Sequence, residues 1–600
     1  MEIACRREPG FGEPRCSLGR AGLSSAAVFF LSFLLALFSG CGRQQRRVDP
    51  GSDTDDGGVD TGTETGGGAS LAHGWGDAPG YRMAWAVGAG GSTPDRYGDG
   101  FWATALFPCG DVGVGGSMKS DQYVFGAGTQ NEIWLDGAED GMLFVARYSH
   151  AGVPLWVSPI KGIDFGISEL EAPGDGSLVA WGETTNGSEP IVFGAGGPGE
   201  MSFFTGGPWA NCFLVRYLED GTPDWVTHST GMPCIAREDG LSIAPDGDFC
   251  ACGGYGEFDP QDPPLEFDDG SGEPFVVPKT GDGHPQGFLA RFDSEGGVEW
   301  AYSVKDDSGF ADTWSALAMP DGSCVFTGYY GNSGVSFQDG SGGEESLSLL
   351  PWAGWGQFVV KYDEPGDLDW IRDLGVAGHQ DGIALGGNAI VSVEAEGDIF
   401  VSGVFNGEII AGTESDPFYQ SAGGDKNDHG IYLARLDGQS GERVFTGLAL
   451  EESSDETGSF DMEPVDFVGD LAVLPAGGIV QGGSFSGKKT FGALEDNETE
   501  LVTTGPGSDA FLAVYEPDDG SLRWAFRVAF GSEIPPYWPE CGEIVQSLSV
   551  NDSGSIFAGG AFLGEATFGT GQNDVTFLSS LGAYDAFLLR LDPVAIFDPR

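Results

Sequence analysis

The sequence has little histidine and little positive charge. It contains 6 histidines, and 28 lysines and arginines stand against 91 aspartates and glutamates, which gives a formal net charge of −63. The histidines form no close pair of the His-x-His or His-x-x-x-His type, which argues against a catalytic metal site or a histidine-based triad. A surface this acidic repels nucleic acid and anionic membranes. With so many acids, pairs of carboxylates arise by chance, so their presence is no evidence for a glycosidase site.

Long hydrophobic runs are also scarce, and the one at 23–38 follows Arg6, Arg7, Arg15 and Arg20. The run ends in Leu-Phe-Ser-Gly-Cys at 37–41, and this segment resembles a bacterial lipoprotein signal. The resemblance implies that Cys41 becomes the lipidated first residue and that the protein sits at the outer membrane of a Gram-negative bacterium. Phe38 departs from the usual leucine. The alternatives are a plain secretory signal, which would make the protein secreted, and a retained transmembrane anchor.

Residues 1–40 are therefore predicted as a signal peptide and residues 41–70 as a disordered linker. The linker has no hydrophobic run and is dense in Gly, Asp and Thr, so it cannot offset the entropy of ordering. An Asp-rich string at 53–57 lacks the ordered ligand spacing of a calcium loop. We predict no cofactor. Calcium is the one ion that the acidic chain could bind.

Cysteine usage fits an exported protein, in which disulfides can form. Of 10 cysteines, Cys5 and Cys16 leave with the signal and Cys41 takes the lipid. The remaining number is odd, so at least one thiol is free or intermolecular. Cys250 and Cys252 share one face of a strand, and this spacing favours a structural role over a zinc site.

A repeat organises the rest of the chain. Its clearest copy, GFLARFDSEGGVEW at 287–300, is an apolar strand ending in a basic residue, then a glycine-bearing turn, then a tryptophan that opens the next strand. Further copies lie at 143–156, 212–225, 357–370, 431–445, 510–524 and 586–592. The last copy lacks a tryptophan, whereas an orphan tryptophan strand stands at 82–88. Seven apolar strands and seven aromatic-opened strands are thus offset by one.

Each repeat carries four strand signals, and seven such units predict an all-β, single seven-bladed β-propeller over 71–600. The blades should be four-stranded and antiparallel. The offset predicts that the last blade takes 546–551, 555–560 and 586–592 from the C-terminus and its fourth strand from 82–88, which removes the free sheet edge. One tryptophan per repeat predicts a packing role between neighbouring sheets.

The repeat resembles that of bacterial seven-bladed β-propeller lipoproteins. The resemblance rests on Asp-Ala-Phe-Leu-Leu-Arg at 585–590 and Asp-Ala-Phe-Leu-Ala at 509–513, and it covers about 81–592. It implies the fold and no established chemistry; Phe445 and Val514 depart from the pattern. The segment 434–445 is similar to the tryptophan-docking motif of quinone dehydrogenases, with Asp437, Gly441 and Phe445 at its spacing. That motif is a packing device, and no cofactor constellation accompanies it.

The sequence therefore favours a lipid-anchored, monomeric cell-surface propeller that binds a glycan or an envelope protein, without enzymatic activity. The alternative is an exported enzyme acting on polysaccharide, a lyase or a glycosidase. Fold alone does not separate the two. A cluster of His, Tyr, Arg and acid at the channel mouth would favour an enzyme, and an aromatic-studded rim without such a cluster would favour binding.

Loop lengths predict which face of the propeller binds. The turns between the first and second strands and between the third and fourth strands of a blade are short. The other connections, 257–286, 336–356, 446–466 and 531–543, are long and acidic, and such length is usually retained for function. We predict Trp352, Trp355, Tyr537 and Trp538 as ligand contacts on that face. The alternative is that these aromatics only pack the loops onto the ring.

Overall fold

The computed structural model describes most of the chain from 81 to 594, and it adds two paired strands near the start, β1 (Cys5–Arg6) and β2 (Arg15–Cys16). The chain divides into two compact units, Met1–Thr65 and Gly66–Arg600, and the fold below is that of the second. Positions not described between 81 and 594 are 92–99, 128, 138–140, 163–165, 185–189, 205–209, 257–262, 271, 279–284, 307–310, 332–333, 350–354, 378–388, 394–396, 407, 414–415, 422–428, 452–465, 494, 496, 504–506, 532–541 and 570–574. Cys41 and the predicted linker also lie outside the described residues, so the predicted domain limits stay predictions.

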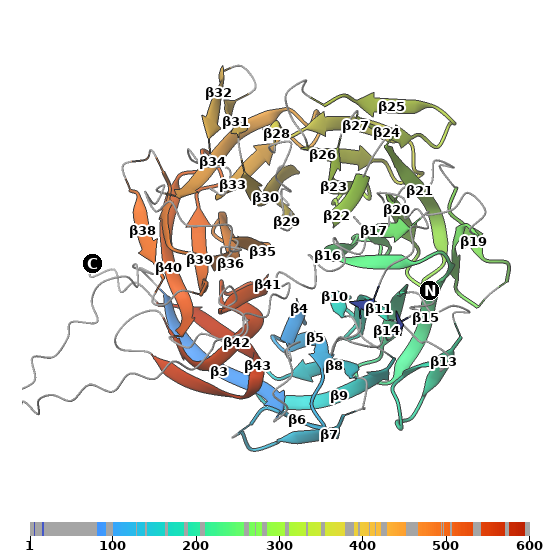
Figure 1. Cartoon of the computed structure of the whole chain (residues 1–600), viewed down its shortest axis with the longest axis vertical. Coiled ribbons are helices and arrows are strands. Elements are labelled where there is room, and N and C mark those ends of the chain that lie inside the picture. Colours follow the sequence, from blue (N-terminus) through green and yellow to red (C-terminus); the bar gives the residue numbers. More distant parts are fainter. Residues whose placement is uncertain are drawn as a thin grey trace, which may run out of the picture. The chain divides into compact units, whose positions relative to one another are not determined.

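The second unit is a β-propeller whose seven blades are four-stranded antiparallel sheets, as the repeat predicts (Figure 1). All its described elements are strands. Blades 1 to 7 begin with the innermost strands β4 (Gly100–Leu106), β10 (Ile167–Glu171), β16 (Cys234–Ile243), β22 (Ala311–Ala318), β29 (Ala389–Val393), β35 (Phe467–Leu474) and β41 (Ile544–Val550). The second strands are β5 (Val112–Met118), β11 (Leu178–Thr184), β17 (Phe249–Gly256), β23 (Cys324–Gly331), β30 (Asp398–Asn406), β36 (Gly478–Phe485) and β42 (Ile556–Phe568).

The third and fourth strands carry the repeat motif. The third strands are β8 (Met142–Tyr148), β14 (Asn211–Tyr217), β20 (Pro285–Phe292), β26 (Trp355–Tyr362), β33 (His429–Leu436), β39 (Asp509–Tyr515) and β43 (Thr576–Pro593). The fourth strands are β9 (Pro154–Lys161), β15 (Pro223–Gly231), β21 (Val298–Asp306), β27 (Leu368–Asp373), β34 (Arg443–Glu451), β40 (Leu522–Gly531) and, for blade 7, β3 (Tyr81–Gly91). The tryptophan strand therefore ends one blade, although in the chain it precedes the next repeat.

The closure of the ring is as predicted. β3 pairs with β43 in antiparallel register, with Arg82 opposite Asp592 and Gly88 opposite Phe587. Figure 1 shows the blue strand β3 beside the red strands β42 and β43. The innermost strand of each blade contacts that of the next, and β41 contacts β4, so the ring has no open joint. Seven buried apolar clusters lie one at each joint between neighbouring blades, because a single sheet cannot cover its own two faces.

A β-bulge, a glycine and a phenylalanine recur together within the blades. In blade 4 the bulge of β22 lies between Thr313 and Ser315 and pushes the Asp312 carbonyl toward β23. A Cβ at Gly328 on β23 would lie 2.1 Å from that oxygen and 2.5 Å from the ring of Phe358 on β26. The same arrangement surrounds Gly116, Gly182, Gly253, Gly483 and Gly560. The glycine in each second strand is thus required by the close approach of its neighbours.

Each blade is extended by a hairpin that the next repeat supplies between its second and third strands. In blade 1, β9 pairs with β12 of the second repeat, and β12 pairs with β13. The hairpins are β6 (Gln122–Phe125) with β7 (Ile133–Asp136), β12 (Ile191–Phe193) with β13 (Met201–Phe203), β18 (Leu265–Asp268) with β19 (Phe275–Val276), β24 (Val335–Gln338) with β25 (Glu344–Leu347), β31 (Glu408–Thr413) with β32 (Asp416–Ser421), β37 (Lys488–Phe491) with β38 (Thr499–Val502), and the adjoining parts of β42 and β43. In blade 4 the pairing passes through β28 (Val376–Ala377), which follows β27.

These hairpins revise the prediction of long irregular connections. The segments 257–286 and 336–356 contain β18–β19 and β24–β25, so part of their length is ordered β-structure at the outer edge of the preceding blade. In the last repeat, Thr576 to Ser579 pairs in the same way with the end of β42. Among the described residues, no helix is long and apolar enough to cross a bilayer.

Candidate functional site

The repeated tryptophan packs between blades, as predicted. At six joints an aromatic ring on a fourth strand covers a glycine in the next blade's turn between third and fourth strands. Each of these glycines has a positive φ, and a Cβ added to it would lie 2.3–3.1 Å from a ring atom. The pairs are Trp85–Gly152, Trp156–Gly221, Trp225–Gly296, Trp300–Gly366, Trp370–Gly441 and Phe445–Gly520. Gly441 and Phe445 of the motif that resembles the docking motif are therefore packing residues.

The seventh joint lacks this turn because the third and fourth strands of blade 7, β43 and β3, are not consecutive in the chain. There the ring of Trp524 contacts the ring of Tyr81, with centroids 5.5 Å apart. Three indoles also donate a hydrogen bond across the joint; for example, Trp300 Nε1 donates to the Glu364 carbonyl at 3.1 Å. The tryptophans are thus engaged within the ring.

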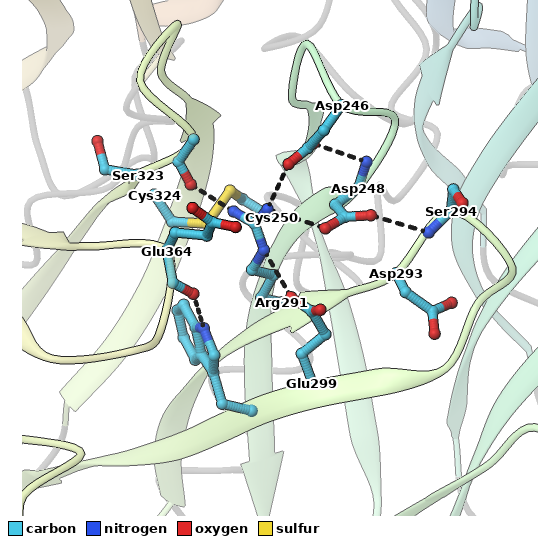
Figure 2. Close-up of polar contacts among 12 residues, drawn as sticks. Asp246, Asp248, Cys250, Arg291, Asp293, Ser294, Glu299, Ser323, Cys324 and Glu364 are labelled. Carbon is cyan, nitrogen blue, oxygen red and sulfur yellow. Dashed lines mark hydrogen bonds and ion pairs between the residues drawn. A yellow bond between two sulfur atoms is a disulfide. The ribbon is translucent and has the colours of Figure 1, made fainter.

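The basic residue of the repeat forms ion pairs within its own blade, as Figure 2 shows for Arg291, whose partners Asp246 and Asp248 lie in the turn between β16 and β17. Its side chain is fully buried, and Nη2 lies 2.9 Å from both Asp246 and Asp248, while Nε lies 2.7 Å from Glu299. Nη1 donates to the carbonyl of Gly322 in the next blade. Because the buried guanidinium has acceptors on every side, Arg291 is a structural residue that joins blades 3 and 4.

Two disulfides also join neighbouring blades. Cys212 on β14 pairs with Cys234 on β16, and Cys250 on β17 pairs with Cys324 on β23. Cys252 is free and buried. Cys109 is free and exposed, and Arg147 Nη2 lies 3.3 Å from its Sγ atom. Cys250 is thus a cross-linking residue, the structural role predicted for Cys252 stays a prediction, and Cys541 lies outside the described residues.

The innermost strands bring carboxyl groups together that the sequence could not single out. This inner acid cluster consists of Glu169 and Glu171 on β10, Asp239 on β16 and Asp470 on β35. Burial and the neighbouring acids raise the pKa of Glu169 and of Asp239 well above the usual range, and the two side chains share a hydrogen bond. Burial raises the pKa of Glu171 to about 8 and that of Asp470 to about 7. Like charges in a half-buried site favour a shared proton.

Several of these acids also link blades. Glu171 Oε1 accepts a hydrogen bond from the Ile243 backbone at 3.2 Å, and Asp470 Oδ2 accepts one from the Leu548 backbone at 2.6 Å. Asp239 has a φ of 53°, a left-handed conformation that is uncommon for a residue other than glycine. The cluster can therefore hold protons and connect inner strands.

Beside the cluster lies a second polar group, formed by residues of the innermost strands β16 and β22 and by Glu183 of the second strand β11. Arg237 forms an ion pair with Asp312, and its guanidinium lies 5.0 Å from the ring centroid of Trp314. Glu183 accepts a hydrogen bond from the Ala236 backbone at 3.1 Å, and burial raises the pKa of Glu183 to about 8. Arginine, acid and tryptophan thus meet near the ring centre without a histidine among them. Within the described part of the chain, no three His, Cys, Asp or Glu side chains are grouped as a metal site.

A cavity of 310 Å³ opens on the short-turn side of the joint between blades 2 and 3. It is lined by Pro173, Gly174, Asp175, Arg216, Gly247, Phe249 and Ser294. This location differs from the long-loop face on which the sequence predicts ligand contacts.

The structure tests little of the predicted aromatic site. Trp352, Tyr537 and Trp538 lie outside the described residues, as does the lipidation residue Cys41. Trp355 opens β26 and is half-buried, and its ring centroid lies 6.3 Å from that of Tyr329. Trp355 thus has a packing contact, and its predicted role in binding stays a prediction.

Comparison with known proteins supplies no function. No family model matches the chain, and no curated protein sequence matches it. Among solved structures it is similar to the WD40 β-propeller domain of Doa1 (10% identity, 85% of this chain and 96% of that chain, TM-score 0.34) and to BamB from Moraxella catarrhalis (7%, 85% and 99%, 0.32). A quinohemoprotein alcohol dehydrogenase from Pseudomonas putida HK5 also matches (11%, 86% and 77%, 0.37). At these values the similarities say nothing about ligands or activity.

Proposed function

We propose that this chain is an exported, lipid-anchored propeller that binds another molecule at the cell surface. The proposal rests on one observation: the repeated polar and aromatic residues pack and form ion pairs within the ring. The tryptophans cover glycines of the next blade, and buried Arg291 is surrounded by Asp246, Asp248 and Glu299. Residues that resemble site residues in the sequence are thus used to build a rigid ring. Such a ring presents variable loops at fixed positions, which is how binding scaffolds work.

Export is supported by the two disulfides, because cross-links of this kind persist in oxidising compartments. Anchoring rests on the resemblance of 37–41 to a lipoprotein signal. Intact-mass analysis of membrane-extracted protein should show a chain that starts at Cys41 and carries two or three acyl groups. A mature protein with another start and no lipid would refute the anchor and leave a secreted binding protein.

The ligand is placed on the long-loop face, with a glycan or an envelope protein as the ligand class. The purified propeller should be screened against both, with and without calcium. The first part of the predicted segment 446–466 belongs to β34 (Arg443–Glu451), so the segment to shorten is 452–465. Shortening 452–465, or changing Trp352 and Trp355 to alanine, should then weaken binding at least tenfold while the unfolding midpoint stays within a few degrees. Binding that follows mutations on the short-turn face instead would refute the assignment of the face.

A second candidate is an enzyme that acts on polysaccharide, and the inner acid cluster favours it. A carboxyl with a raised pKa can donate a proton at neutral pH while a neighbouring carboxylate acts as base. Glu169 and Asp239 supply such a pair. Hydrolysis or eliminative cleavage of a polysaccharide panel, abolished by Glu169→Gln with folding retained, would establish this activity. The binding proposal expects no turnover on any member of the panel.

A further inference from the structure

Four of the seven joints share one contact. The basic side chain on the third strand donates a hydrogen bond to a backbone carbonyl in a turn of the next blade. Lys361 Nζ lies 3.2 Å from the Gly438 oxygen, Arg435 Nη1 lies 2.7 Å from the Pro517 oxygen, and Arg590 Nη1 lies 2.9 Å from the His150 oxygen. Arg291 Nη1 likewise donates to the carbonyl of Gly322, in the turn between the first and second strands of blade 4. The fold therefore has a repeated place for a neutral carbonyl beside a partly buried cation.

Arg216 stands at the same position of blade 2 without such a carbonyl. It forms a hydrogen-bonded ion pair with Asp175, and its Nε lies 4.0 Å from Asp224. That Nε atom is buried and has no hydrogen-bond partner. Arg216 and Gly247 of blade 3 are among the residues that line the 310 Å³ cavity. Gly247 lies in the same turn of its blade as Gly322, and Ser294, which also lines the cavity, lies in the turn that supplies the carbonyl at the three other joints. The cavity thus borders both turns, at a joint where the described residues show no carbonyl contact to Arg216.

The lining of the cavity defines the chemistry of a ligand. Both carboxylate oxygens of Asp175 accept hydrogen bonds within the protein, since Oδ1 accepts from the backbone and the hydroxyl of Ser177 and Oδ2 binds Arg216. The cavity therefore offers donors, the Arg216 guanidinium and the Ser294 hydroxyl, beside the apolar Pro173 and Phe249. A buried donor without a partner is costly, so an acceptor oxygen should fill this place.

The acceptor should be uncharged. Asp175 and Asp224 already flank the guanidinium, and Asp246 and Asp248 lie in the adjoining turn that Figure 2 shows with Ser294. These acids and the net charge of −63 would repel a carboxylate or a phosphate. A backbone carbonyl meets no such repulsion, and it is the group that the basic residue contacts at the four other joints. The carbonyl comes from the turn between the first and second strands for Arg291 and from the turn between the third and fourth strands at the other three joints.

We propose that this cavity binds a polypeptide partner by accepting an uncharged, glycine-bearing turn whose backbone carbonyl contacts Arg216. The proposal rests on the proposed function as a binding protein, and it adds a second contact point on the short-turn face. A cavity of this size admits a turn of a few residues and no helix.

The probe is an uncharged copy of a turn that already makes this contact. In the chain, Pro320-Asp321-Gly322-Ser323 presents the Gly322 carbonyl to Arg291. The capped peptide acetyl-Pro-Asn-Gly-Ser-amide should be titrated into the full-length protein, and binding should be followed by saturation-transfer NMR. N-acetylglucosamine and acetate, titrated in the same way, distinguish a sugar acetamide and an anion from a peptide carbonyl.

Two variants test the cavity, and one controls for general effects. A Cβ at Gly174 meets nothing within 4 Å and the residue has no positive φ, so Gly174→Phe can fill the cavity without backbone strain. Arg216→Met removes the donors and keeps the side-chain length. Gly272→Phe is the matched control, because Gly272 is equally open and lies outside the cavity. Thermal midpoints of all three variants should match that of the unmodified protein.

We expect the peptide to bind the unmodified protein and the Gly272→Phe variant equally, and to lose at least tenfold in affinity with Gly174→Phe and with Arg216→Met. No peptide binding, or binding that neither variant changes, would overturn the proposal. Stronger binding of acetate or of N-acetylglucosamine would also overturn it, because the site would then take an anion or a sugar. Because the long-loop screen uses other residues and other ligands, its outcome is independent of this one.

Discussion

At the scale of single residues, the contact between an aromatic ring and the glycine that it covers recurs at six joints. The glycine needs a positive φ to close the turn, and its missing Cβ leaves room for the ring. Gly366 shows both needs, with a φ of 92° and with Trp300 and Tyr302 next to it. The pair therefore packs the fourth strand of one blade against the turn of the next blade.

Gly366→Ala should destabilise the ring by about 2–4 kcal/mol. The alanine would hold a left-handed backbone at a cost of about 1–2 kcal/mol, and its Cβ would lie 3.0 Å from Trp300 ring atoms. Urea unfolding followed by tryptophan fluorescence measures the loss. Gly272→Ala is the control, since a Cβ there meets nothing within 4 Å. Equal unfolding midpoints for the two variants would contradict the role of the glycine.

The inner acid cluster should make stability depend on pH. The pKa of Glu171 rises from an ordinary 4.5 to about 8 on folding, chiefly through burial. Between these values the folded protein holds a proton that the unfolded chain has lost, so the free energy of unfolding falls as pH rises. The favourable contribution is complete below about pH 4.5 and is lost as pH rises through about 8.

Glu171→Gln should flatten this dependence. The amide cannot ionise, and its oxygen can still accept the hydrogen bond from the Ile243 backbone. We expect the unfolding midpoint in urea to fall less between pH 5 and pH 8 than in the unmodified protein, and to be higher at pH 8. Glu345→Gln on the exposed strand β25 serves as the control. A variant as pH-sensitive as the unmodified protein would show that Glu171 is ionised in the folded ring.

At the scale of elements, the blades are joined by exchanged hairpins. A hairpin that leaves between the second and third strands of one repeat pairs with the fourth strand of the previous blade, as β12 does with β9 and β24 with β21. The exchange covers the edge of each fourth strand, which would otherwise expose unpaired backbone groups. Neighbouring blades are thus held by backbone pairing as well as by side-chain packing.

The two disulfides act between elements, and their contributions should differ. Cys250 and Cys324 are 74 residues apart, and Cys212 and Cys234 are 22 apart. Because a longer closed loop restricts the unfolded chain more, the first should contribute about 4 kcal/mol and the second about 3 kcal/mol. The double alanine variants, unfolded in guanidinium chloride, test this order. A larger loss from the Cys212 and Cys234 pair would contradict the entropic account.

At the scale of the whole molecule, the ring closes by pairing its two ends. The last blade takes three strands from the C-terminal part of the chain and β3 from the N-terminal part. Tyr81 of β3 also supplies the ring contact with Trp524 at the joint that lacks a glycine turn. The stability of every blade therefore depends on one strand that lies far from the rest of its sheet in the sequence.

Deleting 71–88 should lower the unfolding midpoint and broaden the transition, because it exposes the β43 edge and separates blade 7 from blade 1. Thermal unfolding followed by circular dichroism measures both effects. Removal of an equal length from the predicted linker, 49–66, is the control. An unchanged transition after deletion of 71–88 would refute closure by this strand.

The sequence by itself determined the repeat number, the four strands of each blade and the strand that closes the ring. These follow from local patterns, since alternating apolar residues, turn glycines and tryptophans recur at fixed spacing, and the one-step offset at 82–88 leaves no other way to pair the ends. The packing role of the tryptophans followed from the same regularity.

Only the tertiary structure decided which residues meet. Glu169, Asp239 and Asp470 come from three separate blades, and among 91 acids their spacing in the chain carries no signal. The exchanged hairpins and the missing carbonyl at Arg216 are likewise properties of neighbouring repeats, not of one repeat. Side-chain contacts across a joint depend on the three-dimensional stacking of blades, which local sequence patterns do not encode.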